Sequence, residues 1–401
     1  MIEWAQLALL PCPYCSACPT RHLCHERGTA RGCLPGGAPH PHLLHPTKPD
    51  WLARFAELNG FDLHNVQAVD QDIPLLPRYI PHTRLNADVK GYRGLAGMAL
   101  SLCEVQRLAA RVRKHNTSAK AVLGLSEDQL LVILGFERDS FLEEAWPPPR
   151  LQQVLAAIQD VRPDLAIAWG FSVWYRHAEG WVYPRVEQLY SIKRSLVVYE
   201  SLQRWGIPAI PHVYWGNHAD LDRWGRWLAE NPCVSTIAID LQTADSISDW
   251  RIVLRGVTQL RGALRRDVRV LFNGPCALPR IRELDTIWPG CSFSNFGAYF
   301  SALFRFKQGY GLDASWAGNS LLPSQAIFRS AVSEYVTFLA DPARCVRTKV
   351  RWDGWNGSRK PSPAVAGGLA LPIQAYPRTG AAQLALPVAD AEMQRTRPGA
   401  A

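Results

Sequence analysis

Short apolar segments alternate with helical segments from residue 130 onward, and this alternation restricts the fold more than any other feature of the sequence. Six apolar runs have the length of strands: 130–136, 165–173, 207–214, 234–240, 268–272 and 291–294. The sequences between them place apolar residues at helical spacing. One such helix, 185–205, is followed by Gly206, a residue typical of helix ends. Strands that alternate with helices over short connections form parallel βαβ units.

A parallel sheet of this regularity is either a (β/α) barrel or a doubly wound sheet. No Gly-x-Gly-x-x-Gly follows an early strand, which disfavours a dinucleotide-binding sheet. We therefore predict a TIM-like (β/α) barrel, complete or partial. The missing strands are expected at 66–69, at 121–125 or beyond residue 310. Further helices are expected at 98–114 and 323–340.

The composition changes along the chain in a way that predicts four regions. Residues 1–33 form a cysteine-rich segment, and residues 34–50 form a linker rich in proline and histidine. Residues 51–345 form the barrel domain. Residues 346–401 begin with a strand of period two at 346–352 and continue as a loose tail.

The sharpest motif lies in the first region, where four cysteines follow the pattern C-x2-C-x2-C-x5-C. These residues are Cys12, Cys15, Cys18 and Cys24, and Cys33 lies nine positions further on. A loop with so few apolar residues gains its order from a metal. The cysteines are concentrated here rather than spread over a disulfide framework, so we expect a cytoplasmic protein with a local metal site.

Two metals fit this loop. The tandem spacing resembles ferredoxin-type loops and favours a 4Fe–4S cluster, although those loops place the next cysteine after three residues and follow it with proline. Zinc is the alternative, bound by Cys15 and Cys18 together with either Cys24 and Cys33 or His22 and His25. A third interpretation is that these thiols bind no metal. The iron–sulfur cluster is the preferred interpretation.

Polar residues follow most of the predicted strands, where parallel α/β proteins place their sites. The candidate catalytic residues are Ser172, Asn217, Asp240, Asn273 and Asn295. Asp240 ends a buried strand and is predicted to act as a general base or to anchor a ligand, with the asparagines holding the substrate. Helix capping or turn formation is the alternative explanation for several of them.

Basic residues supply candidate anion-binding sites. Arg78, His82 and Arg84 surround a turn next to Pro81, where arginine can bind phosphate or carboxylate. A second set, Arg347, Lys349 and Arg351, lies on one face of the strand at 346–352. The last 56 residues carry +5 of the total charge of +9, which suits a nucleic-acid partner.

A further set of residues carries a resemblance. It comprises Gly170-Phe-Ser172, Tyr175, Tyr190, Arg194 and the run Trp205–Trp215. Through them, residues 130–217 resemble a family of uncharacterised bacterial, plasmid and phage proteins with a domain of unknown function. That family has an aspartate where Gly170 stands. The resemblance implies a mobile-element setting and no particular reaction.

Three functions are consistent with these features. The first is a metal-cluster-containing barrel enzyme that acts on a nucleotide or nucleic acid. The second is a non-catalytic DNA- or RNA-binding accessory protein that uses the cysteine loop and the basic strand at 346–352. The third is an assembly protein whose metal loop only stiffens its N-terminal part. No apolar run reaches the roughly 18 residues of a membrane span, so no membrane association is expected.

Overall fold

The computed structural model describes residues 55–85, 95–173, 185–242, 244, 247–275, 277–299 and 324–341. It contains eight β-strands, which all run parallel to their neighbours. The strands are β1 (Tyr79–Thr83), β2 (Gly97–Ser101), β3 (Leu130–Leu134), β4 (Leu165–Ile167), β5 (Ala209–Ile210), β6 (Thr236–Asp240), β7 (Arg269–Asn273) and β8 (Ser292–Asn295).

The sheet runs in the order β5-β4-β3-β2-β1-β8-β7-β6. Its two outer strands meet through a bridge between His212 and Ala238. Here Val213 N donates to Ala238 O at 2.8 Å, and Ala238 N donates to Pro211 O at 2.9 Å. The strands therefore form a ring, which confirms the predicted TIM-like barrel.

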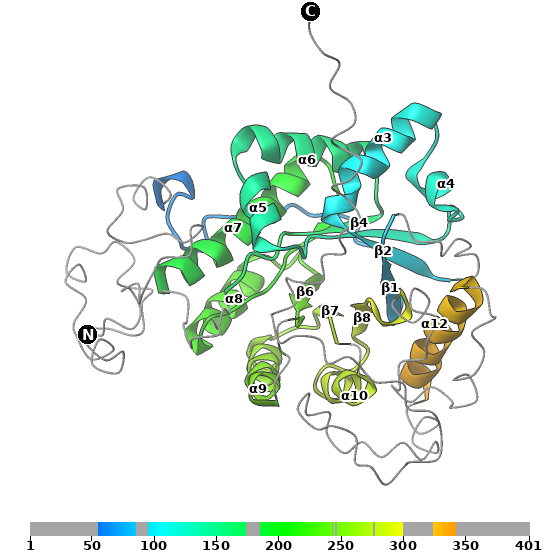
Figure 1. Cartoon of the computed structure of the whole chain (residues 1–401). Helices are drawn as coiled ribbons and strands as arrows, with labels where there is room; N and C mark the ends of the chain where they lie inside the picture. Colours follow the sequence, from blue (N-terminus) through cyan, green and yellow to red (C-terminus); the bar gives the residue numbers. More distant parts are fainter. Residues whose placement is uncertain are drawn as a thin grey trace, which may run out of the picture.

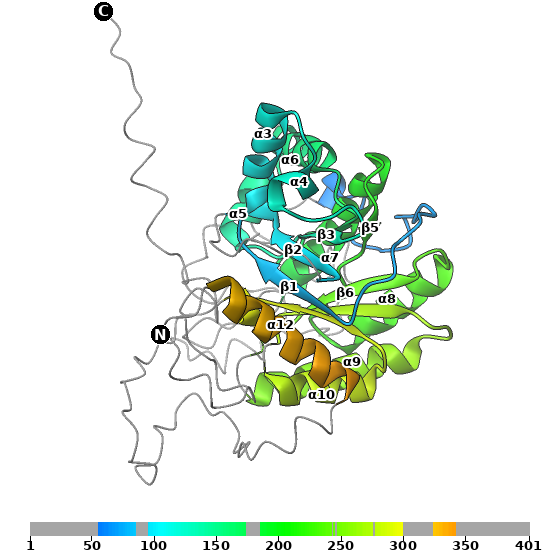
Figure 2. The same ribbon diagram turned by 90° about the vertical axis from the view of Figure 1, so that its right-hand side faces the viewer.

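Helices surround this ring (Figure 1). They are η3 (Leu102–Glu104), α3 (Val105–His115), α4 (Ala119–Leu123), α5 (Asp139–Ala145), α6 (Pro148–Val161), α7 (Arg185–Arg204), α8 (His218–Glu230), α9 (Ile247–Ala263), α10 (Leu278–Ile287) and α12 (Ser324–Ala340). The last of these lies beside β1, where Tyr335 stacks on Tyr79 with 4.4 Å between ring centroids (Figure 2).

Two hydrophobic clusters follow from the alternation of side chains along each strand. The inner cluster fills the barrel and draws residues from β1 to β7, among them Ile80, Val132 and Leu271. The outer cluster lies between the strands and the helices. The interior of the barrel is thus a packed apolar core, which extends to the carboxyl ends of the strands.

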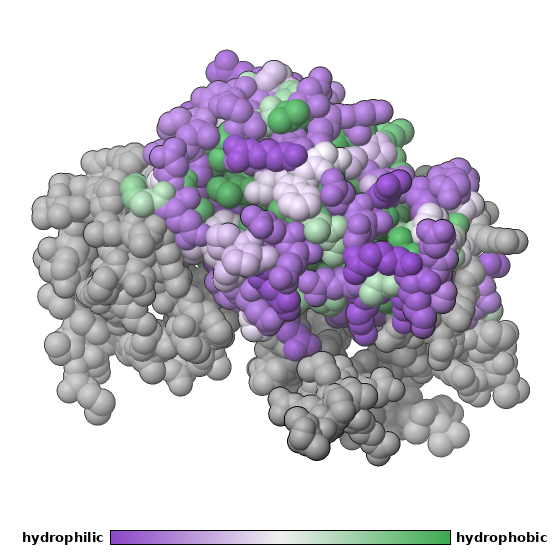
Figure 3. All heavy atoms as spheres, turned by 90° about the horizontal axis from the view of Figure 1, so that it is seen from above, coloured by the Kyte–Doolittle hydropathy of each residue, from purple (hydrophilic) through white to green (hydrophobic). Residues whose placement is uncertain are grey.

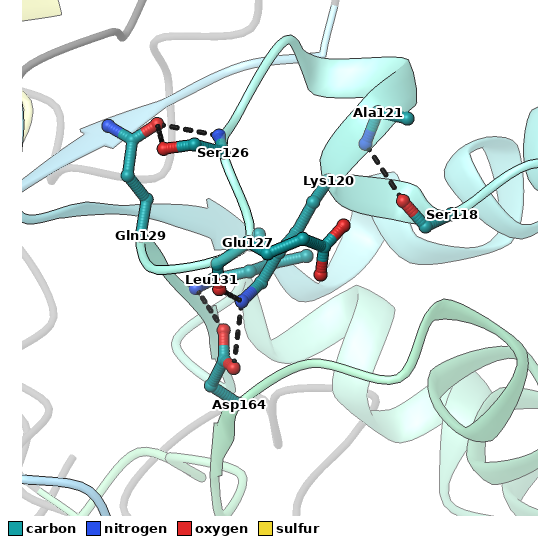
Figure 4. A network of polar contacts seen from close by, with 8 residues as sticks. All are labelled: Ser118, Lys120, Ala121, Ser126, Glu127, Gln129, Leu131 and Asp164. Atoms are coloured by element: carbon teal, nitrogen blue, oxygen red, sulfur yellow. Dashed lines mark hydrogen bonds and ion pairs between the residues drawn. The ribbon is translucent and has the colours of Figure 1, made fainter.

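The segment before β1 covers the amino ends of the strands. Its residues Ile73 and Leu76 pack against the inner cluster. Nearby, a polar network joins the starts of β3 and β4 (Figure 4). Asp164 accepts hydrogen bonds from Leu131 N at 2.7 Å and from Lys120 Nζ at 3.0 Å. This end of the barrel serves stability, and the carboxyl ends of the strands remain for function.

The sequence placed three of the early elements wrongly. The predicted helix at 98–114 begins as strand β2, and only its second half forms α3. The predicted strand at 121–125 is the end of α4, and residues 66–69 form no strand. The missing strands are β1 and β2. The predicted basic turn at 78–84 is therefore wrong, because its residues 79–83 form the buried strand β1.

No helix in the described ranges is long and apolar enough to cross a membrane. Seen from above, the surface of these residues is mostly hydrophilic, with hydrophobic side chains in small separate patches (Figure 3). Two basic residues of α3 form ion pairs on this surface: Arg107 pairs with Glu104, and Arg113 pairs with Asp160.

Close strand packing makes Gly97 of β2 intolerant of a side chain. A Cβ there would lie 2.6 Å from Leu130 O and 2.8 Å from Leu130 Cβ. We expect Gly97→Ala to lower the free energy of unfolding by about 2 kcal/mol, because strand β2 must move away from β3. Gly262→Ala is the matched control in α9, where no atom lies within 4 Å, and it should be neutral or slightly stabilising. Urea denaturation measures both, and equal stability of the two variants would contradict this account.

Candidate active site

Polar side chains replace the apolar interior of the barrel where the strands end. They are His82 of β1, Ser101 of β2, His212 after β5, Asn273 of β7 and Ser294 of β8. Each of these residues is at most 2% exposed. The strands are parallel, so these side chains gather at one end of the barrel. His82 Nε2 lies 2.8 Å from Ser101 Oγ.

Asp240 belongs to the same layer and pairs with Asn273. The two residues are opposite each other in the β6–β7 register, and Asn273 is opposite Ser294 in the β7–β8 register. Asn273 Nδ2 donates to Asp240 Oδ1 at 2.7 Å. The structure thus brings together two of the candidate catalytic residues on neighbouring strands.

The environment of Asp240 raises the pKa of its carboxyl group towards neutral pH. Burial raises the pKa of this carboxyl group to about 7, although the hydrogen bond from Asn273 and the backbone amides of Leu241 and Gln242 act in the opposite direction. The residue itself keeps a partly exposed surface. A carboxyl group with these properties can take up and release a proton during a reaction.

The two histidines of the layer are neutral. Burial lowers the pKa of His212 to about 3. Burial and the charge of Arg84 lower the pKa of His82 well below its ordinary value. Each neutral imidazole offers one hydrogen-bond donor and one acceptor. Neither ring supplies a positive charge to the site.

Four side chains of this layer have buried polar atoms without a hydrogen-bond partner in the described part of the chain. These atoms are His82 Nδ1, both ring nitrogens of His212, Asn273 Oδ1 and Ser294 Oγ. Buried polar groups of native proteins are almost always paired, and the exceptions mark functional sites or bound water. Their concentration at the carboxyl end of the barrel identifies this end as the candidate active site.

Charged residues lie beside this layer, at the ends of β1, β2 and β3. Arg84 Nη1 donates to Cys103 Sγ at 3.2 Å and lies 3.6 Å from Glu104 Oε1. Glu137 Oε1 accepts from Cys103 N at 2.9 Å. Burial, followed by the charge of Glu137, raises the pKa of Cys103 to about 12, so its thiol is a poor nucleophile.

Sequence reasoning missed Glu137. Burial raises the pKa of this carboxyl group, so it joins Asp240 as a second protonatable group near the strand ends. The signal was present, because Glu137 directly follows the apolar run at 130–136. The rule that selected Asp240, a polar residue after a buried strand, also selects Glu137.

Two of the predicted catalytic asparagines have structural roles. Asn217 caps α8, where its side chain accepts from Asp220 N at 3.2 Å within a capping box. Asn295 Nδ2 donates to Pro275 O at 2.8 Å, and its Oδ1 accepts from Tyr79 Oη at 3.0 Å and from Gly297 N at 2.8 Å. The side chain of Asn217 thus stabilises the start of α8, and that of Asn295 stabilises the loops that follow β7 and β8.

Three other predicted site residues lie apart from one another. Ser172 is partly exposed after β4, and its backbone N–H donates to Asp139 Oδ1 at 3.3 Å. Arg78 precedes β1 at the amino end of the barrel, where it pairs with Asp285 at 2.8 Å. It is therefore at the opposite end from Arg84, and the two arginines do not form one anion site.

Gly170 faces the interior beside His212. A Cβ at this position would lie 2.8 Å from Phe136 Cδ1 and 3.1 Å from His212 Cε1. Any side chain there would displace one of these rings. The rings of Phe136 and His212 therefore leave room only for a glycine at position 170.

Several predicted residues lie outside the described ranges. They are the cysteines Cys12, Cys15, Cys18 and Cys24 and the basic residues Arg347, Lys349 and Arg351. Among the residues that the structure describes, no group of three or more His, Cys, Asp or Glu side chains is placed to hold a metal ion.

The fold and the site define a parallel α/β barrel with a polar, largely uncharged cluster at the carboxyl ends of its strands. No family model matches the chain. A search of curated proteins finds none that matches it in sequence.

The raised pKa of Asp240 predicts how stability depends on pH. The carboxyl group has a pKa of 3.8 in the unfolded chain and about 7 in the folded chain. Between these pH values the folded chain binds more protons than the unfolded chain, so the free energy of unfolding falls as the pH rises. One pKa unit corresponds to about 1.4 kcal/mol. We expect Asp240→Asn, which keeps an acceptor for Asn273, to be more stable than the parent chain by up to roughly 4 kcal/mol at pH 8.

This difference should become small at pH 4, where the parent carboxyl group is protonated in the folded chain. Thermal or urea denaturation between pH 4 and pH 9 measures it. The control is Asp222→Asn, an exposed carboxylate on α8. A parallel pH profile for Asp240→Asn and the parent chain would show that Asp240 is not desolvated.

Proposed function

We propose that the chain is an enzyme in which Asp240 acts as a general base at the carboxyl end of the barrel. The observation that supports this most strongly is the pair of Asp240 and Asn273, which lies in a layer of buried polar atoms that have no partner among the described residues. A carboxyl group whose pKa lies near neutral pH is suited to proton transfer at physiological pH. Structural packing alone gives no reason to bury so many polar groups together.

Each residue of the layer has a distinct task in this proposal. Asp240 removes a proton from the substrate or from a water molecule that attacks it. Asn273 holds the carboxyl group in one orientation through its Nδ2 atom and leaves Oδ1 for the substrate. His82, His212 and Ser294 are neutral groups that orient the substrate by hydrogen bonds.

A nucleotide or nucleic acid is the proposed substrate class. The net charge of +9 favours attraction of a polyanion, and more than half of it lies after residue 345. The resemblance of residues 130–217 to phage and plasmid proteins favours a mobile-element setting. In this arrangement the charge of residues 346–401 serves to attract the substrate, and the barrel carries out the reaction.

The function is tested by incubating the protein with nucleotides, nucleosides and oligonucleotides and separating the products by chromatography and mass spectrometry. We expect Asp240→Asn to lower turnover at least about a hundredfold, the usual contribution of a general base. Asn273→Ala should move the rise of activity to higher pH, because the hydrogen bond that lowers the pKa of Asp240 is lost. Asp222→Asn is the surface control. Full turnover in Asp240→Asn would refute the proposed role.

We also propose that Cys12, Cys15, Cys18 and Cys24 hold a 4Fe–4S cluster. The support is their spacing alone, C-x2-C-x2-C-x5-C. Anaerobic purification should give a brown protein with broad visible absorbance and with iron and acid-labile sulfide in equal amounts. Cys15→Ser should lose the colour, whereas Cys233→Ser, a partly buried cysteine of the barrel, should keep it. A colourless protein that contains zinc would overturn this assignment in favour of a zinc site.

A further inference from the structure

The polar layer of the barrel has hydrogen-bonding capacity that the described residues do not use. His212 has two ring nitrogens without a partner, and Asn273, Ser294 and His82 each have one such atom. All four residues are at most 1% exposed. Leaving a buried donor or acceptor unpaired is costly, so these atoms are expected to meet a bound group when the protein is at work.

The chemistry of the atoms restricts that group. Asn273 Nδ2 is engaged with Asp240, so the free atom Oδ1 requires a donor from the ligand. The neutral ring of His212 presents one donor and one acceptor, and His82 Nδ1 and Ser294 Oγ can each serve as either, because His82 Nε2 is engaged with Ser101 Oγ. The matching ligand therefore carries both donors and acceptors.

The charge of the site restricts the group further. Among the described residues, no lysine or arginine of the strands lies in this layer, and Arg84, whose charge acts on His82, is already engaged with Glu104 and Cys103. Burial keeps both histidines neutral, and the same desolvation disfavours any charged group placed beside them. A phosphate or carboxylate would also face Asp240. The buried part of the ligand is therefore uncharged.

Aromatic rings flank the same atoms. Phe136 meets His212 edge to face with 4.9 Å between centroids, and Tyr214 lies 5.3 Å from His212. Phe296 stacks on His82 with 3.5 Å between centroids. Planar heterocycles gain stacking contacts from such surroundings.

We propose that the carboxyl end of the barrel binds the hydrogen-bonding edge of an uncharged nucleobase, with Asn273 Oδ1 accepting from an N–H of the base. This inference rests on the proposed function and specifies its substrate. An uncharged edge with donors and acceptors on a flat ring is what nucleobases present. The phosphate of a nucleotide then stays outside this layer.

The test is a calorimetric titration of the full chain with adenine, guanine, cytosine and uracil, followed by the nucleoside and a single-stranded oligonucleotide of the base that binds. We expect saturable binding of at least one base. Ser294→Ala should weaken it about tenfold, the loss that corresponds to one buried hydrogen bond. Ser195→Ala is the matched control, since it removes an equally buried and unpartnered hydroxyl from α7. Tighter binding of the oligonucleotide than of the nucleoside would identify nucleic acid as the source of the base.

Thermal unfolding of the free variants gives an independent readout. Ser294→Ala should keep or raise the melting temperature of the ligand-free chain, because an unpaired buried hydroxyl is removed. A marked drop would assign Ser294 a structural role and contradict the inference. Failure of all four bases to bind, or equal binding by a polyol such as glucose, would overturn it as well.

The outcome can be separated from that of the proposed function. Binding is also measured with Asp240→Asn, which keeps the acceptor for Asn273 but lacks the base. If this variant and the parent bind a nucleobase and the parent shows no turnover, only the acid–base role fails. If the parent turns over a nucleotide whose base it does not bind in the free form, and Ser294→Ala leaves turnover intact, only the nucleobase inference fails.

Discussion

The closure of the sheet between the segment after β5 and strand β6 is the contact on which the candidate site depends. This contact is an isolated bridge between His212 and Ala238, and β5 itself contains only two residues in regular pairing. It nevertheless makes the eight carboxyl ends converge on one interior. Without it, His212 and Asp240 would lie on opposite edges of an open sheet. The same bridge thus completes the fold and places a buried histidine next to the strand that bears the proposed base.

The barrel separates stability and function between its two ends. At the amino ends, Asp164 and Lys120 satisfy each other and the backbone, and Ile73 and Leu76 cover the apolar interior. At the carboxyl ends, the polar layer keeps five atoms unpaired within the described residues, and Asp240 is held where its ionisation opposes folding. Unpaired polar atoms and a buried carboxyl group lower the stability of the folded chain. They are expected at functional sites, where stable packing elsewhere in the fold compensates for them.

The sequence predicted the later part of the barrel because each strand from β3 onward is an isolated apolar run between helices. The first two strands escaped this reasoning for physical reasons. Strand β1 contains Pro81 and His82, two residue types that are typical of turns, although both are buried in the structure. Strand β2 passes directly into η3 and α3, so its apolar residues merged with the helical pattern that follows. The sequence pattern around a short segment does not show that the segment is buried by strands distant in the sequence, as β8 is from β1.

The candidate site was only half predictable for a related reason. The position of Asp240 and Asn273 at strand ends follows from alternation, and the structure pairs them. Asn217 and Asn295 stand at equivalent positions in the sequence, yet their side chains are consumed by a helix cap and by a loop. The difference is that Asn273 keeps a buried oxygen without a partner among the described residues, whereas the side chains of Asn217 and Asn295 are engaged, and this depends on tertiary contacts. His212 shows the converse. A histidine inside an apolar strand suggests a core residue, yet neither of its ring nitrogens has a partner among the residues that the structure describes. The buried atoms without partners in the described part of the chain, more than the residue types, are therefore the basis on which we place the proposed ligand site.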